Sequence, residues 1–98
     1  MNNHINVAIQ ILPKSAQRNE YDIVDVAITE IKKSGLSYLV CPFETVIEGD
    51  YNDIMKLLRT IHEACYNAGA IEIICNMKIH SKNDADATID EKMHKYRI

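Results

Sequence analysis

Residues 42–50, Pro-Phe-Glu-Thr-Val-Ile-Glu-Gly-Asp, join a strand to a helix with almost no intervening chain. The β-branched Val-Ile pair in the middle lies between polar residues, as is typical of a strand whose side chains alternate between two faces. Gly49 then frees the backbone, and Asp50 is a favoured residue for capping the start of a helix. The stretch therefore predicts a strand over residues 44–48 that leads directly into a helix.

Three further segments have the composition of strands. Apolar residues alternate with other residues over 5–12, which is the period of a strand with one strongly apolar face. Pro13 has no N–H to donate to a ladder, so we expect it to end this strand. Residues 36–41 and 70–80 are also β-rich, and the short spacing between 36–41 and 44–48 predicts an antiparallel hairpin.

Apolar residues recur at three- and four-residue spacing in two other segments, which predicts two amphipathic helices. The first follows the N-cap candidate Asn19 and ends at Gly35, which can adopt the left-handed conformation that terminates a helix. The second begins at Asp50 and ends at Gly69. Thr88, with a glutamate three residues later, forms a capping box for a short C-terminal helix.

The predicted order is strand, helix, strand, strand, helix, strand. With right-handed crossovers, this order gives a ferredoxin-like βαββαβ sandwich of the α+β class. Its antiparallel sheet has four strands, both helices cover one face, and the strands at 5–12 and 44–48 lie in the middle. We expect residues 1–98 to form this one domain, because 98 residues with 47% hydrophobic content allow one modest core. The uncovered sheet face predicts a homodimer or homotetramer that associates through its sheets.

The composition argues against several classes of protein. The net charge is -3 without a Lys/Arg block, so we expect no nucleic-acid partner. No apolar run approaches the ~20 residues that span a bilayer, and no signal peptide opens the chain, which predicts a cytoplasmic protein without membrane insertion. The three cysteines and four histidines show no metal-ligand spacing, so we expect buried free thiols and no metal site.

Polar residues within strongly apolar strands are the candidates for a ligand site, because a buried polar group needs a partner. Amides and carboxylates can present paired donors and acceptors to an aminopyrimidine, and an aromatic or acidic side chain favours a cationic ring. Hydrogen bonds among these residues, or to waters at a subunit interface, explain the same pattern equally well. The candidates are Gln10, Thr45, Glu48 and Asn76, with Tyr38 and Lys78 as weaker ones.

Two carboxylates on the strand at 44–48 raise the question of catalysis. Glu44 and Glu48 share one face, so a general acid and base pair is conceivable, but no nucleophile or companion histidine lies near them in the sequence. We therefore predict no enzyme and no catalytic residue, and we expect Lys78 to neutralise Glu48 across the sheet. Thr45 lies on the opposite face from Glu48, so the two cannot contact one ligand within a protomer unless the strand bulges.

Five segments, spread over nearly the whole chain, match a known pattern. They are residues 9–13 (Ile-Gln-Ile-Leu-Pro), 34–38 (Ser-Gly-Leu-Ser-Tyr), 45–50 (Thr-Val-Ile-Glu-Gly-Asp), 76–79 (Asn-Met-Lys-Ile) and 90–93 (Asp-Glu-Lys-Met). Together they resemble the small thiamine-binding family with YkoF-like, ferredoxin-like domains. Glu72, His80 and Lys82 depart from it, since family members often carry an arginine, or an aspartate followed by arginine, in those neighbourhoods. The assembly or the preferred ligand can therefore differ here.

The resemblance implies a cytoplasmic, non-enzymatic protein that binds thiamine or its hydroxymethylpyrimidine moiety, for vitamin B1 transport or salvage. It implies association through the sheets and no cofactor. Carried over by motif position, the polar strand residues named above become the expected pyrimidine contacts. The alternative function is a structural or regulatory oligomerisation module without a small-molecule ligand. A third hypothesis is a small enzyme with Glu44 or Glu48 as its base.

Overall fold

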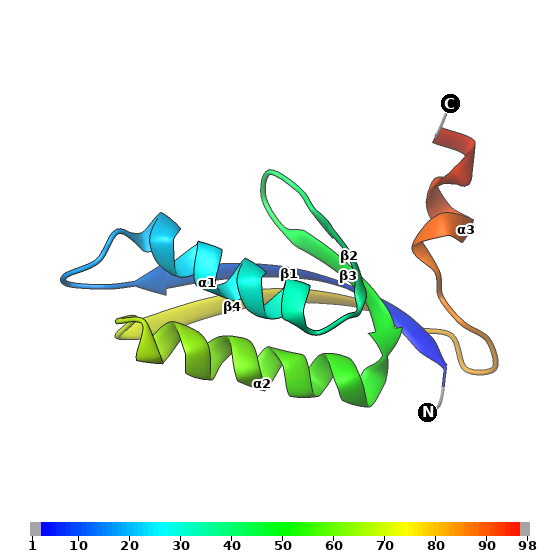
Figure 1. The fold of residues 1–98 in the computed structure, drawn as a ribbon. Coiled ribbons are helices and arrows are strands. Elements are labelled where there is room, and N and C mark those ends of the chain that lie inside the picture. The colour runs from blue at the N-terminus through cyan, green and yellow to red at the C-terminus, as the bar shows by residue number, and fades with distance from the viewer. Residues whose placement is uncertain (1–2, 97–98) are drawn as a thin grey trace.

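The computed structural model describes residues 3–96 as a sheet with helices on one side (Figure 1). The strands form one antiparallel sheet in the order β2-β3-β1-β4, and α1 and α2 cover one face. The predicted ferredoxin-like α+β fold is confirmed, with β1 and β3 in the middle. The elements are β1 (His4–Lys14), α1 (Glu20–Lys33), β2 (Ser37–Val40), β3 (Thr45–Asp50), α2 (Tyr51–Asn67), β4 (Glu72–His80), α3 (Ile89–Met93) and the 3-10 turn η1 (His94–Tyr96).

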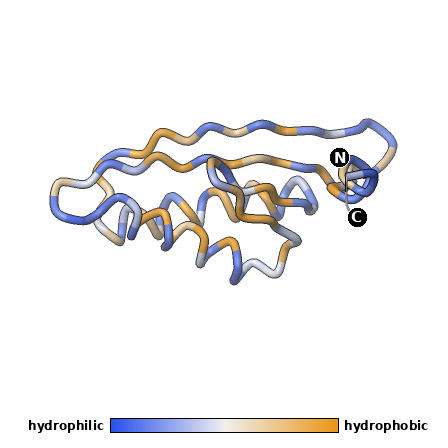
Figure 2. The backbone as a smooth tube through the Cα atoms, turned by 90° about the horizontal axis from the view of Figure 1, so that it is seen from above, coloured by the Kyte–Doolittle hydropathy of each residue, from blue (hydrophilic) through white to orange (hydrophobic). Residues whose placement is uncertain are grey.

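The hydrophobic core lies between the sheet and the two long helices. Ile5, Val7 and Ile9 of β1 are at most 3% exposed, and the alternate residues of β1 point to the other face of the sheet. Figure 2 shows this alternation of apolar and polar positions along the strands. Burying an isoleucine side chain contributes about 1.5–3 kcal/mol, so these residues fix which face meets the helices. The helices contribute Ile23, Ala27 and Ile31 from α1 and Ile54, Leu57, Ile61 and Cys65 from α2.

The prediction that Pro13 ends the first strand is wrong, because β1 continues to Lys14. Pro13 pairs with Ile73 of β4, whereas the pairing of β1 with β3 already stops at Ile9 and Thr45. At Pro13, β1 therefore has no neighbour on its β3 side, and a residue without an N–H is tolerated at such a free edge. The last part of β1 therefore extends beyond β3 and pairs with β4 alone.

The predicted junction between strand and helix is confirmed, with shifted bounds: β3 covers Thr45–Asp50 instead of 44–48. The side chain of Asp50 accepts a hydrogen bond from the backbone N–H of Asn52 at 3.1 Å and so caps α2. A Cβ at Gly49 would meet Leu36 Cδ2 at 3.0 Å, so the absence of a side chain lets the chain pass close to Leu36.

The remaining elements agree with the sequence patterns apart from their ends. β2 and β4 are shorter than the predicted 36–41 and 70–80. Asn19 and Thr88 cap α1 and α3 through their side-chain oxygens, as predicted. Gly35 ends the turn after α1 with a φ of 76°, the left-handed conformation expected of it. Within residues 3–96, no helix has the length and apolar character needed to cross a membrane.

The cap at Asp50 generates a stability prediction. Replacing Asp50 with alanine removes the acceptor for the Asn52 N–H, and we expect the free energy of unfolding to fall by about 1 kcal/mol. Asp50→Asn keeps a capping oxygen and should lose less than about 0.5 kcal/mol. Urea unfolding followed by circular dichroism measures both variants. Equal losses for the two would contradict the capping role.

Candidate functional site

The predicted ligand residues are divided between the two faces of the sheet. In antiparallel strands, directly paired residues share a face, so the pairings place each side chain. Thr45 pairs with the core residue Ile9, and Tyr38 pairs with the core residue Ile47, so both face the helices. On the opposite face, which we call the open face, lie Gln10, Glu48, Asn76 and Lys78. The expected separation of Thr45 from Glu48 is thus found in the structure.

A hollow of about 430 Å³ lies on the open face and is lined by three of the predicted residues, Gln10, Asn76 and Lys78. Asn76 Nδ2 donates a hydrogen bond to Gln10 Oε1 at 3.1 Å. Lys78 was expected to neutralise Glu48, but its Nζ lies 3.6 Å from Glu44 Oε1 instead. The Lys78 side chain is 84% exposed, so this ion pair adds little stability.

A second hollow, of about 310 Å³, lies on the helix side between α1, the end of β1 and the β2–β3 loop. We call it the helix-side hollow. Thr45 lines it and is 6% exposed, and Gln10 and Glu44 line both hollows. Because β3 has no residue paired with Gln10, the central strands part at this point and the two hollows adjoin. The other walls are mainly apolar and include Val24, Ala27, Ile28, Val40 and Phe43.

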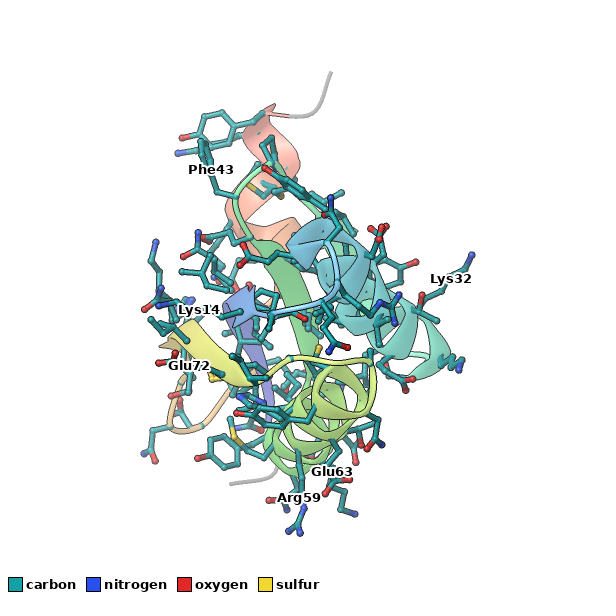
Figure 3. All side chains as sticks on the ribbon, turned by 90° about the vertical axis from the view of Figure 1, so that its left-hand side faces the viewer. Lys14, Lys32, Phe43, Arg59, Glu63 and Glu72 are labelled. Carbon is teal, nitrogen blue, oxygen red and sulfur yellow. The ribbon has the colours of Figure 1, made fainter. Side chains whose placement is uncertain are left out.

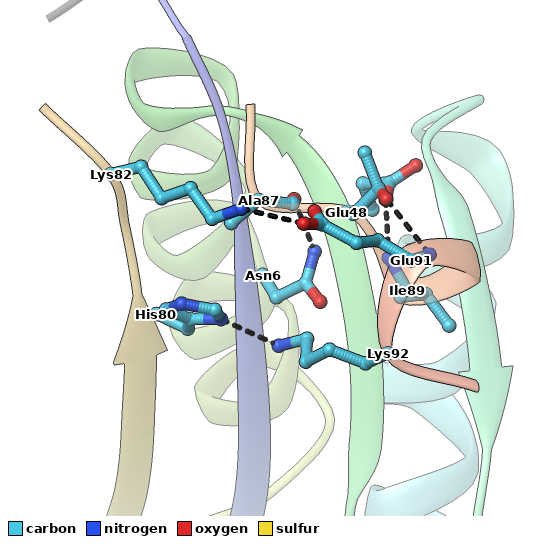
Figure 4. A network of polar contacts seen from close by, with 9 residues as sticks. Asn6, Glu48, His80, Lys82, Ala87, Ile89, Glu91 and Lys92 are labelled. Atoms are coloured by element: carbon cyan, nitrogen blue, oxygen red, sulfur yellow. Dashed lines mark hydrogen bonds and ion pairs between the residues drawn. The ribbon is translucent and has the colours of Figure 1, made fainter. Parts of the chain in front are cut away.

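Glu48 holds the start of α3 and lines neither hollow. Its Oε1 accepts a hydrogen bond from the Ile89 N–H at 2.7 Å, at the first residue of α3 (Figure 4). Asn6, which pairs with Glu48 in the sheet, is 4% exposed and donates from Nδ2 to the Ala87 carbonyl at 2.7 Å. Asn6 Oδ1 has no hydrogen-bond partner among residues 3–96. Glu48 and Asn6 together attach the C-terminal segment to one end of the open face.

His80 and Lys82 hold the same segment. Lys82 Nζ donates to Glu91 Oε1 at 2.8 Å, and this hydrogen bond is the main reason that the pKa of Glu91 lies below its usual value. Lys92 Nζ lies 2.8 Å from His80 Nδ1, to which it donates (Figure 4). His80 and Lys82 therefore contact the chain's own C-terminal segment. Sequence reasoning missed this role, and the partners of Asn6 and Glu48, because the contacts join residues far apart in the chain.

The three cysteines differ in burial, and His62 contacts the backbone of its own helix, α2. Only Cys65 is buried, whereas Cys41 and Cys75 are partly exposed, so the expectation of buried thiols holds for one residue of the three. Burial is the main cause that raises the pKa of the Cys65 and Cys75 thiols. His62 Nδ1 lies 2.9 Å from the Leu58 carbonyl within α2. Across residues 3–96, no group of three or more potential metal ligands is gathered.

The Glu48 contact generates a prediction about the C-terminal segment. Glu48→Ala removes the acceptor for the Ile89 N–H, and we expect hydrogen exchange at this amide to become at least about fivefold faster, since a lost partly buried hydrogen bond costs about 1–3 kcal/mol. Glu48→Gln retains an acceptor oxygen and should exchange more slowly than Glu48→Ala. The measurement is amide exchange by NMR. Wild-type exchange in Glu48→Ala would refute the contact.

The chain is similar to known proteins over nearly its whole length. A UPF0045 protein of Clostridium perfringens is 37% identical and aligns over 94% of this chain and 96% of its own. A Bacillus cereus structure, solved as a domain of unknown function, superposes with a TM-score of 0.94 at 33% identity, covering 98% of this chain and 92% of that one. A Thermotoga maritima protein, solved as a candidate for thiamine biosynthesis or salvage, superposes with a TM-score of 0.86 at 28% identity, covering 96% and 99%.

The family comparison identifies the chain. The sequence model described as "Thiamine-binding protein" matches residues 7–97, which include all four strands and both long helices apart from the first residues of β1. The matched span includes the residues that line the two hollows. The chain therefore belongs to the thiamine-binding protein family.

Proposed function

We propose that this protein binds thiamine or its hydroxymethylpyrimidine moiety in the helix-side hollow and catalyses no reaction on it. The single observation that carries the proposal is the convergence of Gln10, Glu44 and Thr45 on a hollow whose other walls are mainly apolar. Small-molecule sites usually combine apolar walls with a few convergent polar groups that fix the orientation of the ligand. Membership of the thiamine-binding protein family supports the choice of ligand.

The polar residues suit an aminopyrimidine. The Glu44 carboxylate can accept hydrogen bonds from an exocyclic amino group, and the Thr45 hydroxyl can donate to a ring nitrogen. The Gln10 amide offers both a donor and an acceptor. Thiamine also carries a positive charge on its second ring, which the negative charge of Glu44 and the exposed ring of Tyr21 at the rim would favour. The apolar walls would take the faces of the pyrimidine ring.

In this proposal the residues of the open face position those of the helix-side hollow. Asn76 holds the Gln10 amide by their hydrogen bond, and Lys78 faces the Glu44 carboxylate. Neither Tyr38 nor Glu48 lines either hollow. We therefore assign Glu48 to the attachment of α3, and we assign Tyr38 to the surface of the edge strand β2.

The two carboxylates that suggested an acid and base pair have separate partners. Glu44 faces Lys78, and Glu48 accepts from the Ile89 backbone. This division supports binding over catalysis. We further propose a cytoplasmic role in vitamin B1 transport or salvage, and a homodimer or homotetramer formed through the open faces. Exposed apolar side chains on the open face support the association; they are Leu12, Leu39 and Ile74.

Calorimetry tests the binding proposal. Titration of the wild-type protein with thiamine and with hydroxymethylpyrimidine, at protein concentrations that detect millimolar affinity, should give binding heat. Thr45→Val removes the hydroxyl with little change of shape, and Glu44→Gln removes the charge. We expect each to weaken binding by about tenfold, which corresponds to about 1.4 kcal/mol.

Glu63→Gln is the matched control for this experiment. Glu63 is an exposed carboxylate on α2 that pairs with Arg59 at 3.0 Å and lines neither hollow (Figure 3). Its substitution should leave the affinity within about twofold of the wild-type value. Absence of heat with both ligands would overturn the proposal, as would an equal loss of affinity in all three variants.

The alternative function is a structural or regulatory module without a small-molecule ligand, and the exposed apolar side chains of the open face favour it. Light scattering of the wild-type protein and of Leu39→Glu tests it. A smaller particle for Leu39→Glu, together with no binding heat, would support the module. A monomeric wild type would reject it.

A further inference from the structure

The helix-side hollow has a single charged side chain in its walls. Glu44 is the one acidic residue that lines it, and no lysine, arginine or histidine of residues 3–96 does so. The amide of Gln10 and the hydroxyl of Thr45 are neutral. A concave site with one sign of charge and mainly apolar walls attracts ligands of the opposite charge and repels those of the same charge. The charge of the ligand is therefore a property that this hollow can select.

The first turn of α1, which contributes Tyr21 to the rim of the hollow, disfavours anions. Helix N-termini commonly bind phosphate groups through their free backbone N–H groups. Here Asn19 Oδ1 accepts a hydrogen bond from the Tyr21 N–H at 2.8 Å, and the Asn19 carbonyl accepts one from the Asp22 N–H at 3.1 Å. Glu20 and Asp22 add two carboxylates to the same turn. The chain's own acidic groups therefore already offset the positive end of the helix.

Two lysines adjoin the helix-side hollow, and each of them faces a carboxylate. Lys14 lines a neighbouring hollow together with Glu20, and its Nζ lies 3.9 Å from Glu72 Oε2 (Figure 3). Lys78 lies on the open face, with its Nζ 3.6 Å from Glu44 Oε1. A phosphate group on the ligand would have to compete with a carboxylate for either lysine.

We propose that the helix-side hollow selects the unphosphorylated, cationic form of its ligand and excludes the phosphate ester. The inference rests on the proposed binding of thiamine and deepens it. A phosphate monoester carries a charge of about −1.5 to −2 at neutral pH. On the short side chain of the second ring, it would lie within or close to the screening length of about 8 Å from Glu44. Unphosphorylated thiamine would instead bring a positive charge toward the same carboxylate.

This selection places the protein between two classes of reaction. A phosphate ester of the ligand must first be hydrolysed, which consumes water and gives inorganic phosphate and the free alcohol. The bound ligand keeps this hydroxyl, to which a kinase reaction would transfer the terminal phosphoryl group of a nucleoside triphosphate. The protein therefore holds the ligand after dephosphorylation or uptake and before phosphorylation.

Lys78 tunes the selection, because its ammonium group is the counter-ion of Glu44 in this structure. A cationic ligand has to take over that role. Lys78→Met removes the charge and keeps most of the side chain's length, so we expect thiamine to bind about two- to threefold more tightly. Neutral hydroxymethylpyrimidine should keep its affinity within about twofold. Tighter binding of both ligands to the same extent would contradict this role of Lys78.

Calorimetry with thiamine and with thiamine monophosphate tests the selection. For the wild-type protein, we expect thiamine to bind at least about tenfold more tightly than its ester. Glu44→Gln removes the charge and keeps the shape, so this ratio should fall to within about threefold, because thiamine loses an attraction and the ester loses a repulsion. The matched control Glu63→Gln, which alters a carboxylate outside both hollows, should keep the wild-type ratio.

Three results would overturn the inference. They are wild-type protein that binds the ester as tightly as thiamine, a ratio that Glu44→Gln leaves unchanged, and ester binding that Lys14→Gln weakens by more than about threefold. Circular dichroism checks that each variant is folded. Each result leaves the binding of thiamine itself intact. Failure of the proposed function is distinct, because then neither thiamine nor hydroxymethylpyrimidine gives binding heat.

Discussion

The difference in length between β1 and β3 is the constraint on which the rest of the structure depends. β1 has eleven residues and β3 has six, so the register that buries Ile5, Val7 and Ile9 leaves the end of β1 paired with β4 alone. At the point where β3 begins, the two hollows adjoin and share Gln10 and Glu44. A longer β3 would close this opening and remove the proposed ligand site.

Local patterns in the sequence were sufficient for most of the fold. Alternation placed the strands, and Asn19 and Thr88 marked the starts of two helices because capping depends only on nearby backbone groups. The prediction failed at Pro13, whose effect depends on whether a third strand lies alongside. The prediction also failed at Lys78, which was assigned to Glu48 but pairs with Glu44. Which of the two carboxylates Lys78 can reach depends on where β3 begins and ends along the sheet.

The side chains at the two ends of the open face make different contacts. At one end, Asn6 and Glu48 attach the C-terminal segment, and His80 and Lys82 add contacts to the same segment. At the other end, Asn76 and Lys78 contact the residues that adjoin the helix-side hollow. The sequence patterns gave Glu48, Asn76 and Lys78 as candidates for one ligand site, and only the three-dimensional contacts separate Glu48, which attaches the C-terminal segment, from the other two.

Mapping backbone amide shifts by NMR during titration with hydroxymethylpyrimidine tests the central claim most directly, because it locates the ligand on one side of the sheet. The account predicts the largest shifts at Thr45, at the β2–β3 loop, and at Val24 and Ile28 of α1. Shifts confined to the open face, at Leu39, Val46 and Ile74, or no shifts at millimolar ligand, would contradict it.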